Sequence, residues 1–77
     1  MRTIYIVSDE NHGNLAITLS YEAAINFLIK EGWIPKESEA FFKNMYHNEF
    51  NEYMRDTDET LSITKVWESF YNVFKLR

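Results

Sequence analysis

Residues 2–19 (RTIYIVSDENHGNLAITL) decide the fold of this chain. Residues 2–7 are rich in β-branched and aromatic side chains, which favours a strand. In residues 15–19, the larger apolar side chains of Leu15, Ile17 and Leu19 alternate with Ala16 and Thr18. The polar segment between the two runs ends in His12-Gly13-Asn14, residues that tolerate a positive φ. Two short alternating runs around such a turn predict a β-hairpin.

Two helices are expected after the hairpin. Ser20 is suited to cap the first one, whose apolar residues recur at spacings of three and four, and Gly32 is placed to end it. A second helix is expected to begin near Ser38, with His47-Asn48 as a possible site of a bend or break because of its poor helix propensity. Apolar residues at helical spacing form a stripe along this second helix, and this stripe is expected to face the core. The stripe consists of Phe41, Phe42, Met45, Tyr46, Phe50, Tyr53 and Met54.

The last third of the chain is expected to supply a third strand. Residues 56–59 have the composition of a turn. Residues 61–68 fit a strand or a helix by spacing, and their β-branched and aromatic types favour a strand, which would complete a usable sheet. Residues 69–76 fit either a further strand or a short helix. The prediction is an α+β fold of order ββααβ, in which a β-hairpin, two helices and a C-terminal strand place a single layer of helices on a three-stranded antiparallel sheet.

Composition limits how such a fold can be stabilised. The chain has 77 residues, no cysteine, 45% apolar and 17% aromatic residues. A chain of this length is expected to form one domain, residues 1–77. Because disulfides and thiolate metal sites are excluded, its stability must come from the apolar core. We therefore expect most of the thirteen aromatic side chains to be in the core, although an aromatic excess is also typical of partner-binding surfaces.

Negative charge is concentrated in the middle of the sequence. The net charge is −4, and residues 37–59 alone carry seven acidic and two basic side chains. An acidic chain is poorly suited to bind nucleic acid through its phosphates, so direct nucleic-acid binding is not expected. A row of carboxylates can instead imitate the phosphates and occupy a basic groove of a partner. The alternative interpretation of such a segment is a solvated surface without a partner.

No sequence motif indicates an enzyme, a metal or a cofactor. His12 and His47 have no nucleophile or acid at motif spacing, so a non-enzymatic protein is expected. Asp56 begins an Asp-x-Asp segment similar to the start of a calcium loop, but Leu61 and Trp67 stand where that loop needs glycine and glutamate. The longest apolar runs are only three or four residues, far short of a membrane span, and no signal peptide is evident, so no membrane contact and a cytoplasmic location are expected.

The first half of the chain carries a resemblance to a known class of proteins. Residues 4–9 (IYIVSD), then His12-Gly13, then the helix starting at Ser20 with Ala24-Ile25 and Phe27-Leu28 resemble small accessory proteins of phages and mobile elements of Gram-positive bacteria. The similarity covers residues 4–34. It implies a protein that takes over or counters a host function by binding, such as an anti-CRISPR, and it transfers no functional residue.

Two functional hypotheses follow. The first is a protein-binding module, an inhibitor of a host or bacterial protein with a basic, nucleic-acid-binding type of surface, which acts through an acidic helical face. The residues expected to form that face are Glu37, Glu39, Glu49, Glu52, Asp56, Asp58 and Glu59. The second is a homodimer or other homo-oligomer that uses the C-terminal aromatic segment. The residues expected there are Trp67, Phe70, Tyr71 and Phe74.

Overall fold

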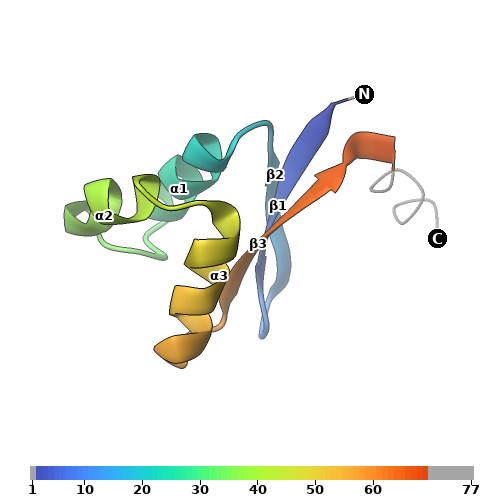
Figure 1. Cartoon of the computed structure of the whole chain (residues 1–77). Helices are drawn as coiled ribbons and strands as arrows, with labels where there is room; N and C mark the ends of the chain where they lie inside the picture. Colours follow the sequence, from blue (N-terminus) through green and yellow to red (C-terminus); the bar gives the residue numbers. More distant parts are fainter. Residues whose placement is uncertain (1, 70–77) are drawn as a thin grey trace.

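The computed structural model describes residues 2–69, and a three-stranded antiparallel sheet with helices on one face forms its framework (Figure 1). The strands are β1 (Thr3–Asp9), β2 (Gly13–Thr18) and β3 (Leu61–Trp67). The helices are α1 (Tyr21–Lys30), α2 (Glu39–Lys43) and α3 (His47–Asp56), with a 3-10 turn η1 (Lys36–Ser38) before α2. The strand order is β2-β1-β3, so β1 is central and the predicted α+β architecture is confirmed.

The hairpin is tighter than its sequence suggested. β1 extends to Asp9 and β2 begins at Gly13, because Asp9 pairs with Gly13 and leaves only three residues for the turn. Gly13 adopts φ of 77°, the left-handed conformation that the turn signal predicted. Ser8 and Asp9, which belong to the polar segment after the first predicted run, are therefore part of β1.

The first helix begins and ends as predicted. The Ser20 Oγ accepts a hydrogen bond from the Ala23 N–H at 3.0 Å, which satisfies one of the free donors of the first turn. Gly32 adopts φ of 80° just after the helix, where a side chain would be strained. The chain then turns back so that Ile34 is buried in the core.

The second predicted helix is divided into two. The break covers residues 44–46, immediately before His47-Asn48, which form the first turn of α3. The Asn44 side chain donates to the Ala40 carbonyl at 2.8 Å and closes α2, and Tyr46 is extended, with ψ of 164°. The break changes the direction of the following side chains, so the seven-residue stripe does not form one buried face.

The core lies between the sheet and the helices. Val7 and Ile63 from the sheet meet Ile25 and Leu28 from α1 and Phe50 from α3, and all five are 0% exposed. Most described aromatic residues lie in this cluster or pack against it, as composition predicted. Three do not, and their exposed fractions are 50% for Phe41, 77% for Tyr46 and 47% for Trp67.

The end of β3 marks the limit of the described chain. The turn predicted at 56–59 is confirmed: α3 ends at Asp56, and Asp58 adopts φ of 58° before the strand begins. Strand rather than helix is confirmed for Leu61–Trp67, and Glu68 and Ser69 are helical. The rest of the segment 69–76, predicted to form a further strand or a short helix, lies outside the described residues.

Candidate functional site

The outer side of α3 carries the most concentrated part of the predicted acidic face. Glu49, Glu52 and Asp56 follow at intervals of three and four residues, which places them on one side of the helix. Together with Met45 and Tyr53 they line a shallow hollow of about 280 Å³. We refer to Glu49, Glu52 and Asp56 as the α3 acidic face.

The three carboxylates of this face differ in their internal roles. Glu49 accepts a hydrogen bond from the Tyr46 N–H at 2.9 Å, so it also caps α3. Within residues 2–69, no hydrogen bond or ion pair engages the Glu52 or Asp56 carboxylate. Both side chains are exposed, and Asp56 lies in the last helical turn, where the helix dipole disfavours an anion. Glu52 and Asp56 therefore do not serve helix stability.

The other predicted acidic residues lie elsewhere. Glu39 accepts a hydrogen bond from the Lys43 Nζ at 3.0 Å, so the charge of Glu39 is compensated within the molecule. The same Nζ lies 3.9 Å from a carboxylate oxygen of Glu22 in α1. Glu37 is on η1, before α2. Asp58 and Glu59 are in the turn after α3, where the Glu59 N–H donates to the Met54 carbonyl at 2.8 Å. The structure thus brings three of the seven predicted residues together on one helix face.

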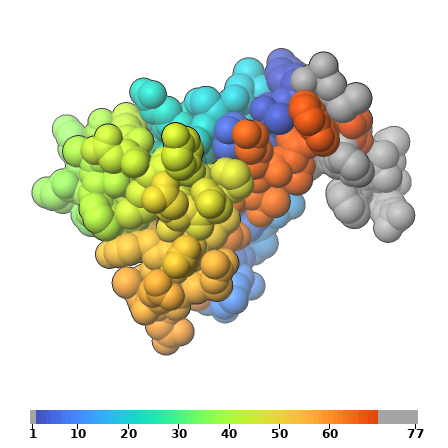
Figure 2. All heavy atoms as spheres, in the orientation of Figure 1, coloured from blue at the N-terminus to red at the C-terminus, as the bar shows by residue number. Residues whose placement is uncertain are grey.

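An exposed aromatic side chain adjoins the α3 acidic face. Phe41 of α2 is 50% exposed, and its ring lies edge-on 5.2 Å from the ring of Tyr53. Tyr53 in turn lines the acidic hollow, so carboxylates and apolar rings share one surface of α2 and α3. Figure 2 shows these two helices forming a continuous part of the molecular surface. Helical periodicity alone assigned Phe41 to the core, because it could not include the break after α2.

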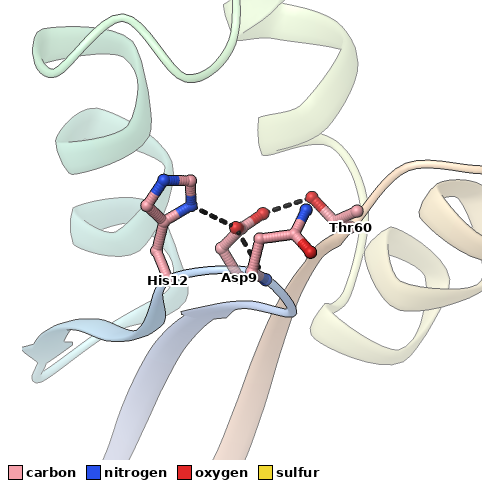
Figure 3. Close-up of polar contacts among 4 residues, drawn as sticks. Asp9, His12 and Thr60 are labelled. Atoms are coloured by element: carbon pink, nitrogen blue, oxygen red, sulfur yellow. Dashed lines mark hydrogen bonds and ion pairs between the residues drawn. The ribbon is translucent and has the colours of Figure 1, made fainter.

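A second group of polar residues lies at the end of the sheet nearest the hairpin turn (Figure 3). Asp9 is 3% exposed, and its carboxylate accepts hydrogen bonds from the Thr60 hydroxyl and from the Asn11 N–H at 3.1 Å. The Nδ1 of His12 is 2.6 Å from the same carboxylate. These contacts hold the pKa of Asp9 below its usual range, and the hydrogen bond from Thr60 has the largest effect on that pKa.

This Asp9 group has a structural function in the sheet. Asp9 links the hairpin turn to the residue before β3, 51 positions away in the sequence. In a nucleophilic triad the hydroxyl would contact the second ring nitrogen of the histidine. Here the Thr60 hydroxyl and the His12 Nδ1 both contact Asp9, so Thr60 is not arranged as an activated nucleophile. Sequence spacing gave no sign of this pairing.

A further hollow, lined by residues far apart in the sequence, was not predicted from the sequence. It measures about 410 Å³ and opens between the start of α3 and the sheet. Its lining is mostly aromatic and includes the ammonium group of one lysine. The lining residues are Tyr5, Tyr21, Met45, Tyr46, His47, Asn48 and Lys65. The Tyr21 hydroxyl donates to the Phe42 carbonyl at 2.5 Å, and burial, followed by the charge of Glu49, raises the pKa of Tyr21 to about 12.

The predicted C-terminal aromatic surface is only partly within the described chain. Trp67 is 47% exposed at the end of β3, which suits a contact surface. Phe70, Tyr71 and Phe74 lie outside the described residues. A bidentate ion pair between Arg2 and Glu68, with contacts of 2.6 and 3.0 Å, holds the end of β3 against the start of β1.

Neither a metal site nor a membrane span is found in the part of the chain that the structure describes. Within residues 2–69, no three His, Cys, Asp or Glu side chains are grouped to hold an ion. None of the helices there has the length and apolar character needed to cross a bilayer. Comparison of the chain with family models, curated proteins and solved structures finds no match.

Proposed function

We propose that this protein is a non-enzymatic binding module that docks the α3 acidic face onto a basic surface of another protein. The observation that carries the proposal is that Glu52 and Asp56 are exposed, adjacent and free of any partner within residues 2–69. Like charges four residues apart on a helix destabilise it by a few tenths of a kcal/mol. A partner that supplies cations would relieve this repulsion.

The neighbouring side chains support a protein partner. Phe41 and Tyr53 place apolar rings beside the carboxylates, and interfaces combine such rings with a charged rim. Arg55, which could have neutralised the face, lines a different hollow with Glu10 and Glu59. The face therefore keeps its negative charge and can attract a basic partner over several ångströms.

A host protein with a nucleic-acid-binding groove is the partner class that we favour. Carboxylates on one helix face can occupy phosphate positions in such a groove. The resemblance of residues 4–34 to phage and mobile-element accessory proteins points in the same direction, towards an inhibitor of the anti-CRISPR kind. In this proposal the protein competes with nucleic acid and does not bind nucleic acid itself.

A charge-matched pair of variants tests the α3 acidic face. Glu52→Gln/Asp56→Asn and Glu10→Gln/Glu31→Gln each change the net charge from −4 to −2, and all four positions are exposed. The probe is an arginine-rich peptide of ten residues, titrated by NMR at low and physiological salt. We expect the first variant to weaken binding about 10-fold and the second by less than about 3-fold. If the peptide binds the α3 acidic face, removing charges from that face weakens binding more than removing the same number of charges elsewhere.

A direct competition experiment then tests the partner class. Host nucleic-acid-binding proteins recovered on the immobilised wild-type chain should be released by added DNA or RNA, and should not be recovered on Glu52→Gln/Asp56→Asn. Equal peptide binding by both charge-matched variants would show that only net charge matters and would contradict the docking face. Recovery that nucleic acid does not affect would contradict the partner class while leaving the face intact.

A further inference from the structure

Within residues 2–69, a side chain closes the outer edge of β3 only at Ile63, and the half of the strand after Ile63 is open. Asn51 of α3 reaches this edge, where its Nδ2 donates to the Ile63 carbonyl and its Oδ1 accepts from the Ile63 N–H, both at 2.7 Å. The side-chain amide thus replaces a neighbouring strand at that residue. Further along β3, no side chain of the described residues makes such a contact with Lys65.

The pairing of β3 with β1 fixes which backbone groups face outward. Hydrogen-bonded positions alternate along an antiparallel pair. The Glu68 N–H donates to the Arg2 carbonyl at 2.9 Å, so even-numbered positions of β3 bond to β1, and Ile63 points outward to Asn51. By the same alternation, the N–H and C=O of Lys65 and the N–H of Trp67 lie on the outer edge. They are unpaired within residues 2–69.

We propose that this open half of β3 pairs with the same half of β3 in a second copy of the chain. The two sheets then join, antiparallel, into one sheet of six strands. Lys65 of each copy lies opposite Trp67 of the other, with the two Val66 residues facing each other at the two-fold axis. This proposal is independent of the α3 acidic face.

The described contacts favour this register over the one in which Lys65 lies opposite Lys65. Shifting it so that Lys65 meets Lys65 would set two ammonium groups opposite each other, which is unfavourable. The same shift would bring Trp67 opposite Ile63, whose backbone groups Asn51 already occupies. The register with Val66 at the axis avoids both conflicts.

The large aromatic hollow gives this register a side-chain partner. Lys65 and Trp67 share the helix-bearing face of the sheet with the core residue Ile63, because they lie two and four residues after it. Residues directly opposite in an antiparallel pair project to the same face. The exposed indole of the second copy therefore lies beside Lys65, which is one of the residues lining the 410 Å³ hollow.

The contact suits the chemistry of both groups. An indole fits a hollow lined mainly by tyrosine, methionine and histidine side chains, and the Lys65 ammonium gains a cation–π contact with it. Figure 1 shows the end of β3 extending beyond the helical layer, so the helices of one copy leave this edge open. The interface is small, below about 1,200 Å² in total, and interfaces of that size are weak. We expect a reversible dimer with a dissociation constant in the micromolar range or weaker.

A proline at position 65 tests the proposal most directly. The Lys65 N–H faces outward, so Lys65→Pro removes an intermolecular donor without removing a bond to β1, and proline is tolerated on strand edges. Sedimentation from about 5 µM to 1 mM should show wild-type mass rising from monomer to dimer. Lys65→Pro and Trp67→Ala should each weaken dimerisation at least 10-fold. Leu19→Ala, which removes a 61% exposed apolar side chain elsewhere, should have no effect.

Two readouts on folded protein complete the test. In a Trp33→Phe background, Trp67 fluorescence should shift to shorter wavelength as the dimer forms. Amide exchange of Lys65 and Trp67 in the wild type should slow with concentration, which tests the edge even if Lys65→Pro does not fold. A monomer at every concentration, a dimer unaffected by either substitution, or exchange at these two amides that is independent of concentration would overturn the proposal.

Discussion

The two halves of β3 belong to one strand but differ in their surroundings. Leu61 and Ile63 are 7% and 0% exposed beneath α3, whereas Trp67, four residues further on, is 47% exposed. Both halves pair with β1 in one continuous register. The difference arises from α3, which packs over the first half and supplies Asn51 to its edge, whereas beside Lys65, in the second half, the start of α3 and the sheet leave the 410 Å³ hollow.

The first half of β3 therefore contributes mainly to the stability of the fold, whereas the second half is available for contact with another molecule. In the covered half, the side chains of Leu61 and Ile63 are buried, and Asn51 bonds both outward backbone groups of Ile63. In the open half, an indole, an ammonium group and edge backbone groups remain for another molecule. The two sides of α3 show the same division, since Phe50 faces the core while Glu52 and Asp56 face solvent. The predictions below test where this boundary lies.

The largest expected effect is on the packing of the covered half. Ile63→Ala should lower the free energy of unfolding by about 3 kcal/mol, because it leaves a cavity in a fully buried site. Val66→Ala, in the open half and only partly buried, should cost less than about 1 kcal/mol. Urea unfolding followed by circular dichroism measures both. Equal losses would show that the two halves are packed alike.

Closure of the edge should contribute less than packing. Asn51→Ala leaves the Ile63 N–H and C=O without their partner and should cost about 2 kcal/mol, the usual penalty for unsatisfied part-buried groups. Asn48→Ala, at an exposed position of the same helix, should change stability by less than about 0.5 kcal/mol. If both variants unfold at the same urea concentration, the amide does not close the edge as described.

The smallest of the three effects concerns acid stability at the covered end. The Thr60, His12 and Asn11 contacts lower the pKa of Asp9 in the folded state relative to the unfolded chain. Stability from this group is therefore complete above about pH 4, the unfolded value, and is lost as the pH falls through the folded pKa. Urea midpoints between pH 6 and pH 2 should fall less steeply for Asp9→Asn than for the wild type.

A conservative change at the same contact sharpens that measurement. Thr60→Val removes the largest cause of the lowered pKa of Asp9 while retaining the shape of the side chain. Its midpoints should show a pH dependence between those of the wild type and Asp9→Asn. A wild-type curve parallel to that of Asp9→Asn would mean that this carboxylate does not stabilise the folded state.

Much of the fold could be predicted because its signals are local. The hairpin turn, the Ser20 cap, the Gly32 stop and the strand Leu61–Trp67 each depend on residues within one turn or on a period of two. The break at residues 44–46 was placed slightly too late. It depends on the Asn44 side chain and on the Glu49 cap acting together, and propensity does not register that combination.

The candidate site could be predicted only as a set of seven acidic residues. Three of them, Glu49, Glu52 and Asp56, lie on one side of α3, because intervals of three and four residues define a helix face. It could not show that Glu39 is compensated by Lys43, because charge counts do not reveal pairing. The aromatic hollow could not be predicted, because its lining comes from four separate parts of the chain.

The sequence by itself determined the elements, their order and the location of the negative charge, because periodicity, capping and turn chemistry act over a few neighbouring residues. Only the tertiary structure decided which half of β3 is covered, which carboxylates remain free and where an indole is left exposed. Those outcomes depend on contacts such as Asn51 with Ile63 and Asp9 with Thr60. Such contacts join residues 12 and 51 positions apart, and they exist only once α3 and the sheet have packed together.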